Sequence, residues 1–208
     1  MMDIHRAVQE FAVLAPPFLL AITVHEFAHG YVAYRLGDPT AARQGRLTLN
    51  PLKHLDLFGV LAFIIMKIGW AKPVPVDPRY FKEPNRGMLW VSLAGIGANC
   101  ALAVICGIMV RLLVLSAGRM PMYFLYPLLH MLAAGVWINV MLAIFNLIPI
   151  PPLDGSKVLL HLLPERLAAG YARLEPFGFL LLLALFYAGV IEKIMLPLIA
   201  IAQRLLLG

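Results

Sequence analysis

Two histidines and a glutamate near the start of the chain have the spacing of a metal-dependent hydrolase. His25, Glu26 and His29 form an HExxH pattern. Residues four positions apart share one helix face, so both imidazoles can bind one zinc ion while the Glu26 carboxylate serves as a general base. The pattern lies inside an apolar stretch, residues 11–36. Because polar groups in hydrocarbon are costly, the first hypothesis is a zinc hydrolase with its active site inside a membrane.

The composition favours a membrane protein. Of the 208 residues, 62% are hydrophobic and only 13% are charged, and the mean hydropathy is +0.85. A soluble domain of this size does not need so much apolar surface, so we expect the bilayer to solvate most of it. The length predicts a single intramembrane domain, residues 1–208, with a core over about 10–160 and a C-terminal helical segment over 176–207.

Apolar segments predict the elements that position the motif. Residues 10–35, 88–110 and 123–147 are each long enough to span a bilayer. Residues 57–70 are apolar but short for a crossing, which fits a re-entrant or tilted segment. Residues 73–76 alternate proline with valine, which forbids a central strand and allows an extended edge strand. The expected fold is an all-α membrane protein, a polytopic transmembrane helix bundle with a re-entrant segment and a short extended edge strand.

Basic residues predict the orientation in the membrane. The net charge of +6 is spread over loops, which suits anionic lipid headgroups better than nucleic acid. The basic loops 35–53 and 72–86 should both face the cytoplasm, and they share a side only if residues 57–70 enter and leave by the same face. We expect a multi-pass protein of a bacterial or archaeal cell membrane, with its active site towards the cytoplasmic side. Residues 177–207 fit either one tilted, broken helix or two short ones, and we favour one crossing followed by a terminal interfacial helix.

A catalytic zinc site needs a third protein ligand and an open position for water. Asp154 lies in a proline-rich break after the third apolar segment, and bent backbone at membrane depth is tolerated where it lines a cavity. The predicted metal ligands are therefore His25, His29 and Asp154, holding about one Zn²⁺ per chain, with Glu26 as the catalytic base. The alternative role for Asp154 is a helix N-cap.

Three further residues are candidates for substrate binding. The amide of Asn146 could hold a substrate carbonyl or a developing oxyanion, although a helix C-terminal cap explains this residue equally well. Val74 and Val76 keep the N–H groups that their proline neighbours lack, so they could pair with an unwound substrate strand. Asn99 lies among small residues and is expected to make an interhelical hydrogen bond.

Together these motifs resemble the site-2 protease family of intramembrane zinc metalloproteases. HExxH in an early transmembrane helix, followed by the pattern from Asn146 to Asp154-Gly155 in a late one, matches the signatures of that family. Three further segments are also similar, residues 45–56, 69–76 and 92–99. The resemblance covers roughly residues 12–160, with Ile96 where the family usually has proline. The chain looks like a compact form without PDZ or CBS domains.

The resemblance implies an intramembrane zinc endopeptidase that cuts peptide bonds in or near transmembrane segments of membrane-anchored regulatory proteins. The implied partners are a transmembrane protein substrate and the lipid bilayer, and no nucleic acid is expected. The sequence does not indicate an oligomeric state. A membrane metal-ion carrier and a catalytically inactive scaffold that binds transmembrane helices are the alternatives. A carrier needs polar residues along a path through the membrane, and the outer half of the expected helices has few of them.

Overall fold

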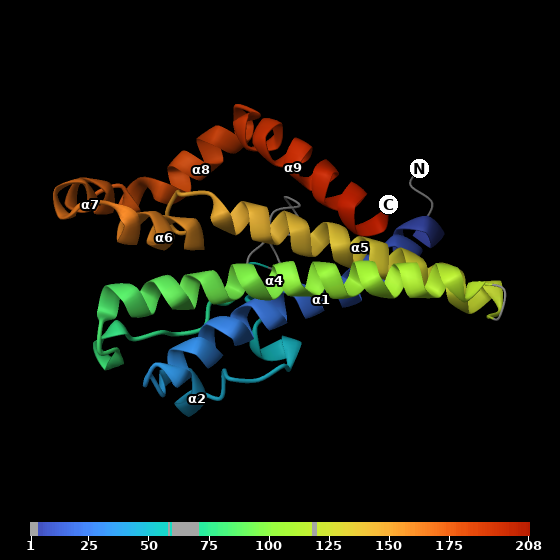
Figure 1. Ribbon diagram of the computed structural model, residues 1–208, viewed down its shortest axis with the longest axis horizontal. Coiled ribbons are helices and arrows are strands. Elements are labelled where there is room, and N and C mark those ends of the chain that lie inside the picture. Colours follow the sequence, from blue (N-terminus) through green and yellow to red (C-terminus); the bar gives the residue numbers. More distant parts are fainter. Residues whose placement is uncertain (1–3, 58, 60–70, 118–119) are drawn as a thin grey trace. The chain divides into compact units, whose positions relative to one another are not determined.

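Long helices dominate the computed structural model, which describes residues 4–57, 59, 71–117 and 120–208 (Figure 1). The three longest are α1 (Ile4–Arg35), α4 (Pro84–Leu115) and α5 (Met122–Leu147). The shorter helices are α2 (Thr40–Arg43), η1 (Pro51–Lys53), η2 (Pro78–Tyr80), α6 (Asp154–Leu162), α7 (Glu165–Ala172), η4 (Glu175–Phe177), α8 (Gly178–Tyr187) and α9 (Val190–Leu207). The regular elements of the described residues are all helices, which confirms the all-α prediction.

Four helical stretches are long and apolar enough to cross a membrane: Val8–Arg35, Pro84–Leu115, Met122–Leu147 and Glu165–Tyr187. The first three match the predicted spans. The fourth begins earlier than the predicted residue 177, because the polar segment before it is also helical. Gly189, with a φ of 69°, then separates α8 from α9.

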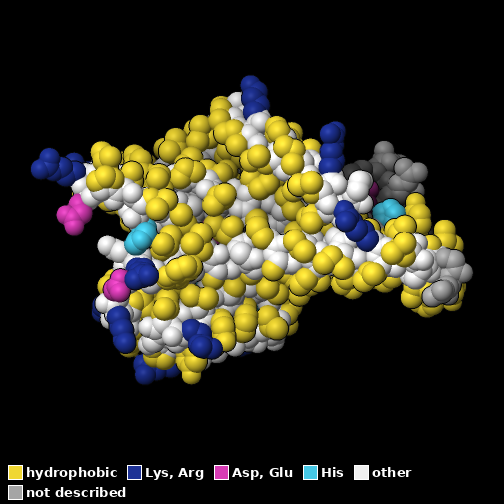
Figure 2. Space-filling model, in the orientation of Figure 1, with side chains coloured by type: hydrophobic (Ala, Val, Ile, Leu, Met, Phe, Trp, Pro, Cys, Tyr) yellow, Lys and Arg dark blue, Asp and Glu magenta, His cyan; other side chains and the backbone are white. Residues whose placement is uncertain are grey.

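Apolar side chains cover most of the face drawn in Figure 2, and the Lys and Arg side chains on it are scattered. Large side chains along the long helices are exposed, among them Phe11, Leu112 and Phe179. A surface of this kind suits contact with lipid and not with water. With the four long apolar helices, it identifies an integral membrane protein.

The chain forms two compact units. Unit 1 contains Met1–Ala21, Asn99–Phe145 and Leu182–Gly208, and unit 2 contains Ile22–Ala98 and Asn146–Leu181. In unit 1 the helices approach one another at a small residue, because a Cβ at Gly135 of α5 would lie only 3.0 Å from Cys106 Sγ of α4. Close helix packing of this type is typical of membrane bundles.

A buried amide pair links three helices within unit 1. Asn99 Nδ2 of α4 donates to Asn139 Oδ1 of α5 at 2.9 Å and to the Ala21 carbonyl of α1 at 3.3 Å. Asn139 Nδ2 donates in turn to the Gly135 carbonyl at 2.8 Å. Both amides are buried. The predicted interhelical hydrogen bond of Asn99 is therefore confirmed.

Unit 2 has an apolar cluster between the second half of α1 and the first half of α4. Ala33, Phe81 and Val91 are buried together, with Val76 packed against them. Side chains hold the backbone of residues 72–77 beside this cluster. Arg46 Nη2 donates to the Lys72 carbonyl at 2.7 Å, and Asp38 Oδ2 accepts from the Asp77 N–H at 2.7 Å.

The predicted edge strand is not confirmed. Residues 72–77 do not form a strand. Among the described residues, the only β-type pairing is an isolated antiparallel bridge between Leu55 and Ala71. Pro73 and Pro75 lack the N–H groups that a strand ladder needs. The predicted re-entrant segment lies outside the described residues, apart from residues 57 and 59.

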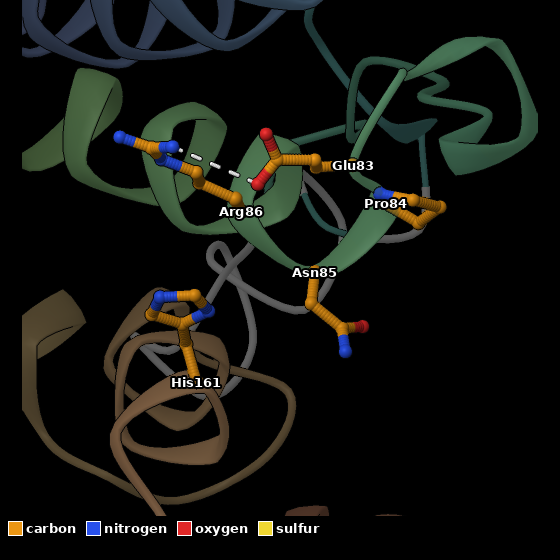
Figure 3. Close-up of a pocket in the computed structure, with 5 residues that line it drawn as sticks. All are labelled: Glu83, Pro84, Asn85, Arg86 and His161. Carbon is orange, nitrogen blue, oxygen red and sulfur yellow. Dashed lines mark ion pairs between the residues drawn. The ribbon is translucent and has the colours of Figure 1, made fainter.

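A surface pocket of about 380 Å³ lies within unit 2, near the start of α4. It is lined by Glu83, Pro84, Asn85, Arg86 and His161 (Figure 3). An ion pair joins Arg86 Nη1 to Glu83 Oε2 at 3.6 Å across its wall. Because none of the predicted metal ligands lines this pocket, it is separate from the candidate site.

Candidate active site

Helix α1 presents both histidines of the HExxH motif on one face, as their spacing predicts. The Nε2 atoms of His25 and His29 are 2.9 Å apart, and the two rings are nearly perpendicular at 89°. Both side chains are buried. Helix α4 faces them with Gly95, where a Cβ would lie 2.5 Å from His29 Cε1 and 2.7 Å from His25 Cε1. Only glycine leaves room for both imidazoles at this approach.

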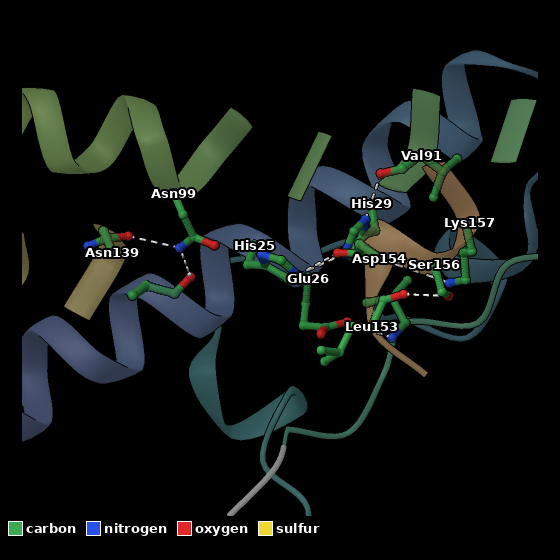
Figure 4. A network of polar contacts seen from close by, with 12 residues as sticks. His25, Glu26, His29, Val91, Asn99, Asn139, Leu153, Asp154, Ser156 and Lys157 are labelled. Carbon is green, nitrogen blue, oxygen red and sulfur yellow. Dashed lines mark hydrogen bonds and ion pairs between the residues drawn. The ribbon is translucent and has the colours of Figure 1, made fainter. Parts of the chain in front are cut away.

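Asp154 lies beside both histidines (Figure 4). Its Oδ2 is 3.3 Å from His25 Nε2 and 3.2 Å from His29 Nε2. Asp154 is the first residue of α6, and the N-cap position is occupied by Leu153, so the structure does not use Asp154 as an N-cap. Gly155 follows because a Cβ there would overlap the Leu147 carbonyl at the end of α5.

The three atoms have the spacing of zinc ligands. Nitrogen and oxygen ligands lie about 2.0–2.2 Å from zinc, which puts tetrahedral ligands about 3.3–3.6 Å from one another. The separations of 2.9, 3.2 and 3.3 Å are close to that spacing. Within the part of the chain that the structure describes, His25, His29 and Asp154 are the group close enough to hold a metal ion.

Hydrogen bonding prepares His29 to bind a metal. Its Nδ1 lies 2.7 Å from the Val91 carbonyl, which can only accept, so Nδ1 carries the proton and Nε2 presents a lone pair. Among the described residues, no hydrogen bond satisfies the buried Oδ2 of Asp154. A lone pair and a carboxylate oxygen 3.2 Å apart repel each other unless a cation lies between them. The donor set therefore fits zinc.

The charge state of Asp154 also suits a metal. A carboxyl of this type is ionised at neutral pH, and the two imidazoles and Lys157 are the polar groups that Asp154 faces. Asp154 is therefore the carboxylate that metal binding requires. Lys157, one turn further along α6, places its Nζ 4.0 Å from the other oxygen, Oδ1.

The carboxylate of Glu26 makes a contact that the sequence did not reveal. Its Oε2 accepts a hydrogen bond from the Val74 N–H at 2.8 Å. Val74 is buried against α1, where a Cβ at Gly30 would lie 3.0 Å from Val74 Cγ1. One predicted substrate-binding group thus bonds to the predicted base. Val76 is half-buried, and its side chain packs against the apolar cluster of unit 2.

Asn146, the third predicted substrate-binding residue, lies half-buried near the end of α5.

Other residues contribute to the site although the sequence did not point to them. Val91 was not predicted, because it acts through its backbone carbonyl and its side-chain type does not indicate that contact. Gly95 lies in the segment 92–99 that resembles the family, but nothing in the sequence indicated its approach to the imidazoles. The signal that could have found Lys157 is its i, i+3 spacing from Asp154 on a helix.

Comparison with known proteins shows the family. The chain matches peptidase family M50 over residues 13–189. It is 39% identical over 181 residues to the Bacillus subtilis protein named "Putative zinc metalloprotease YwhC", covering 87% of this chain and 83% of that protein. It is 34% identical over 188 residues to "Putative zinc metalloprotease Rip2" of Mycobacterium tuberculosis, covering 86% of this chain and 68% of that protein.

Rip2 of Mycolicibacterium smegmatis is 31% identical over 194 residues, covering 88% of this chain and 70% of that protein. No solved structure matches the chain. The family match extends past residue 160, where the recognisable motifs stop, and includes α7 and α8. A match over most of the chain, together with three converging donor atoms that fit a metal ion, establishes that this protein belongs to peptidase family M50, the site-2 proteases, and is a zinc metalloprotease.

Proposed function

We propose that the protein is an intramembrane endopeptidase that cuts membrane-anchored regulatory proteins in or near their transmembrane segments. One observation carries this proposal. His25 and His29 lie on a helix long and apolar enough to cross a membrane, and Asp154 Oδ2 lies within 3.3 Å of both. A metal site with two of its ligands on such a helix can reach peptide bonds that enter the bilayer, which a protease confined to water cannot do.

In this proposal His25, His29 and Asp154 hold one zinc ion. When bound, the metal polarises the scissile carbonyl and lowers the pKa of a water at its open position. Glu26, next to the ligand His25, takes a proton from the attacking water and returns it to the leaving amine. Its hydrogen bond from the Val74 N–H keeps the carboxylate in a defined orientation before the substrate arrives.

Residues 72–77 support a position for the substrate chain. A transmembrane helix must unwind before a protease reaches its carbonyls, and an unwound segment needs backbone partners. Alternate residues of an extended chain direct their N–H and C=O groups to the same side, so Val76 faces the side on which Val74 meets Glu26. We infer that the substrate strand pairs at Val76, and at Val74 when Glu26 releases that N–H. Asn146 completes this substrate site by donating from its amide to a substrate carbonyl or oxyanion.

The active site is proposed to open towards the cytoplasm. The basic residues between α1 and α4, among them Arg43, Lys53 and Lys72, favour the cytoplasmic side by the positive-inside rule. A single added cysteine in this region, tested for labelling by a membrane-impermeant reagent in intact cells and in inverted vesicles, checks the orientation. Labelling in intact cells alone would contradict it.

The decisive experiment separates metal binding from chemistry at Glu26. Wild-type protein and Glu26→Gln are purified in detergent, their zinc content is measured, and both are incubated with a model transmembrane substrate. We expect about one zinc per chain in each protein and cleavage by the wild type alone, because Glu26 is a base and not a ligand. Cleavage by Glu26→Gln at the wild-type rate would overturn the proposed mechanism.

A further inference from the structure

The loop that carries Asp154 has few means of fixing its own position. Of its six residues, 148–153, three are proline. Two hydrogen bonds form within the loop, from the Ile150 N–H to the Ile148 carbonyl and from the Leu153 N–H to the Ile150 carbonyl. Because proline has no N–H, the loop depends on groups outside it for further support.

Helices α7 and α8, which follow the metal-site helix α6 in the chain, supply that support. The Tyr171 hydroxyl of α7 donates to the Pro149 carbonyl at 2.9 Å. Gly178, the first residue of α8, lies directly against Pro151. A Cβ at Gly178 would overlap the Pro151 carbonyl oxygen and lie 2.7 Å from its carbonyl carbon. The two helices therefore contact the loop at Pro149 and at Pro151.

Movement at Pro151 passes readily to Asp154. Only Pro152 and Leu153 lie between them, and proline fixes its own φ. Leu153 is held in turn, because its carbonyl accepts from the Ser156 hydroxyl at 2.7 Å and from the Ser156 N–H at 3.0 Å. Metal sites tolerate ligand displacements of only about 0.2 Å. A shift of the loop by a fraction of an ångström therefore moves Asp154 out of range.

We propose that Tyr171 and Gly178 are positioning residues for the metal site, acting through the 148–153 loop to place Asp154 against His25 and His29. This inference rests on the proposed role of Asp154 as a zinc ligand. It makes α7 and α8 a structural support of the metal site. It also gives a physical reason for the family match to extend to residue 189, past the last metal ligand.

The test measures zinc affinity by competition with a chromophoric chelator, on the whole protein in detergent. Gly178→Ala forces the loop away and should weaken zinc binding by about tenfold or more, the usual cost of losing outer support at a metal site. Tyr171→Phe should weaken it less. Gly170→Ala is the matched control, because a Cβ at Gly170 meets nothing within 4 Å, and it should bind zinc as the wild type does.

A double-mutant cycle distinguishes positioning from general stabilisation. In an Asp154→Ala background, Tyr171→Phe should have no further effect on the remaining zinc affinity, since no third ligand is left to position. An equal loss in both backgrounds would overturn the proposal. If Gly178→Ala does not fold, the zinc affinity of Tyr171→Phe tests the proposal instead. A wild-type zinc affinity in Tyr171→Phe would also overturn the proposal.

The result for Asp154→Ala alone keeps two failures apart. If it binds zinc as tightly as the wild type does, the proposed ligand set is wrong, and the positioning role falls with it. If its zinc affinity falls sharply while the affinities of Gly178→Ala and Tyr171→Phe do not, the ligand set stands and only the support by α7 and α8 is wrong.

Discussion

Each unit contains a buried polar cluster, and the two clusters are built in opposite ways. In unit 1, the amide of Asn99 donates to the amide oxygen of Asn139, and the Nδ2 of each also donates to a backbone carbonyl. In unit 2, His29 Nε2 and Asp154 Oδ2 present electron pairs to each other at 3.2 Å. A self-complementary pair needs nothing more, whereas converging acceptors need a cation. Burial alone does not separate structural from functional polar groups in a membrane helix, but the balance of donors and acceptors does.

The largest expected effect comes from removing a member of the acceptor cluster. His25→Ala, His29→Ala and Asp154→Ala should each bind zinc far more weakly, purify largely without it and lose all measurable cleavage, since catalytic zinc needs three protein ligands. Metal analysis and a cleavage assay on each purified variant check this. Full zinc occupancy in Asp154→Ala would show that Asp154 is not a ligand, and the contrast between the two polar clusters would then be wrong.

A smaller effect is expected from crowding the histidines without removing a ligand. Gly95→Ala places a methyl group 2.5 Å from His29 Cε1, so the rings must move and zinc content should fall strongly. Gly97→Ala, two residues along α4, is the control, since its Cβ meets nothing within 4 Å. Equal zinc content in the two variants would show that the glycine at position 95 is not required by the imidazoles.

Substitutions in residues 72–77 should affect cleavage and leave the metal in place. Val76→Pro removes one free N–H, so a transmembrane substrate should be cut poorly while a short extended peptide is still cut. Val74→Pro also removes the hydrogen bond to Glu26 and should slow both reactions. Steady-state kinetics with zinc content as the control measure this. If neither variant changes either rate, the segment is a connector only.

The smallest effect on catalysis is expected from the amide pair. Asn139→Ala should keep zinc and cleavage and lower the free energy of unfolding in detergent by about 0.6 kcal/mol, and at most about 1.7 kcal/mol. Unfolding in a denaturing detergent measures this change. Loss of zinc from Asn139→Ala would show that the amide pair and the ligand cluster are energetically coupled.

Sequence patterns predicted the parts of the protein that depend on periodicity and residue type. Apolar length gave the long helices, and the four-residue spacing of the histidines put them on one face. The sequence could not predict contacts that residues make through their backbone atoms. The Val91 carbonyl and the Val74 N–H carry no residue-type signal, and their partners lie 62 and 48 residues away in the chain.

The segment 72–77 illustrates the same limit. Its prolines showed which residues lack an N–H for strand pairing, but not which side chains bind the remaining backbone N–H and carbonyl groups of the segment. The sequence showed Arg46 as one charge of a basic loop and as part of a segment similar to the family, but not that its guanidinium donates to the Lys72 carbonyl. Nothing in the sequence indicated that Asp38 accepts a hydrogen bond from the Asp77 N–H. Long-range bonds between a side chain and the backbone depend on the tertiary fold, so local patterns do not predict them.

The hydrogen bond between Glu26 and Val74 has a consequence for where cuts fall along a substrate. In the proposed function, the extended segment 72–77 both pairs with the substrate and orients the base, so the same stretch of backbone positions the two. Strand pairing repeats every two residues, about 6.8 Å in an antiparallel pair, so a bound substrate slips only in steps of that length. Secondary cuts should then lie two residues from the main one, and mass spectrometry of the products would reveal that ladder.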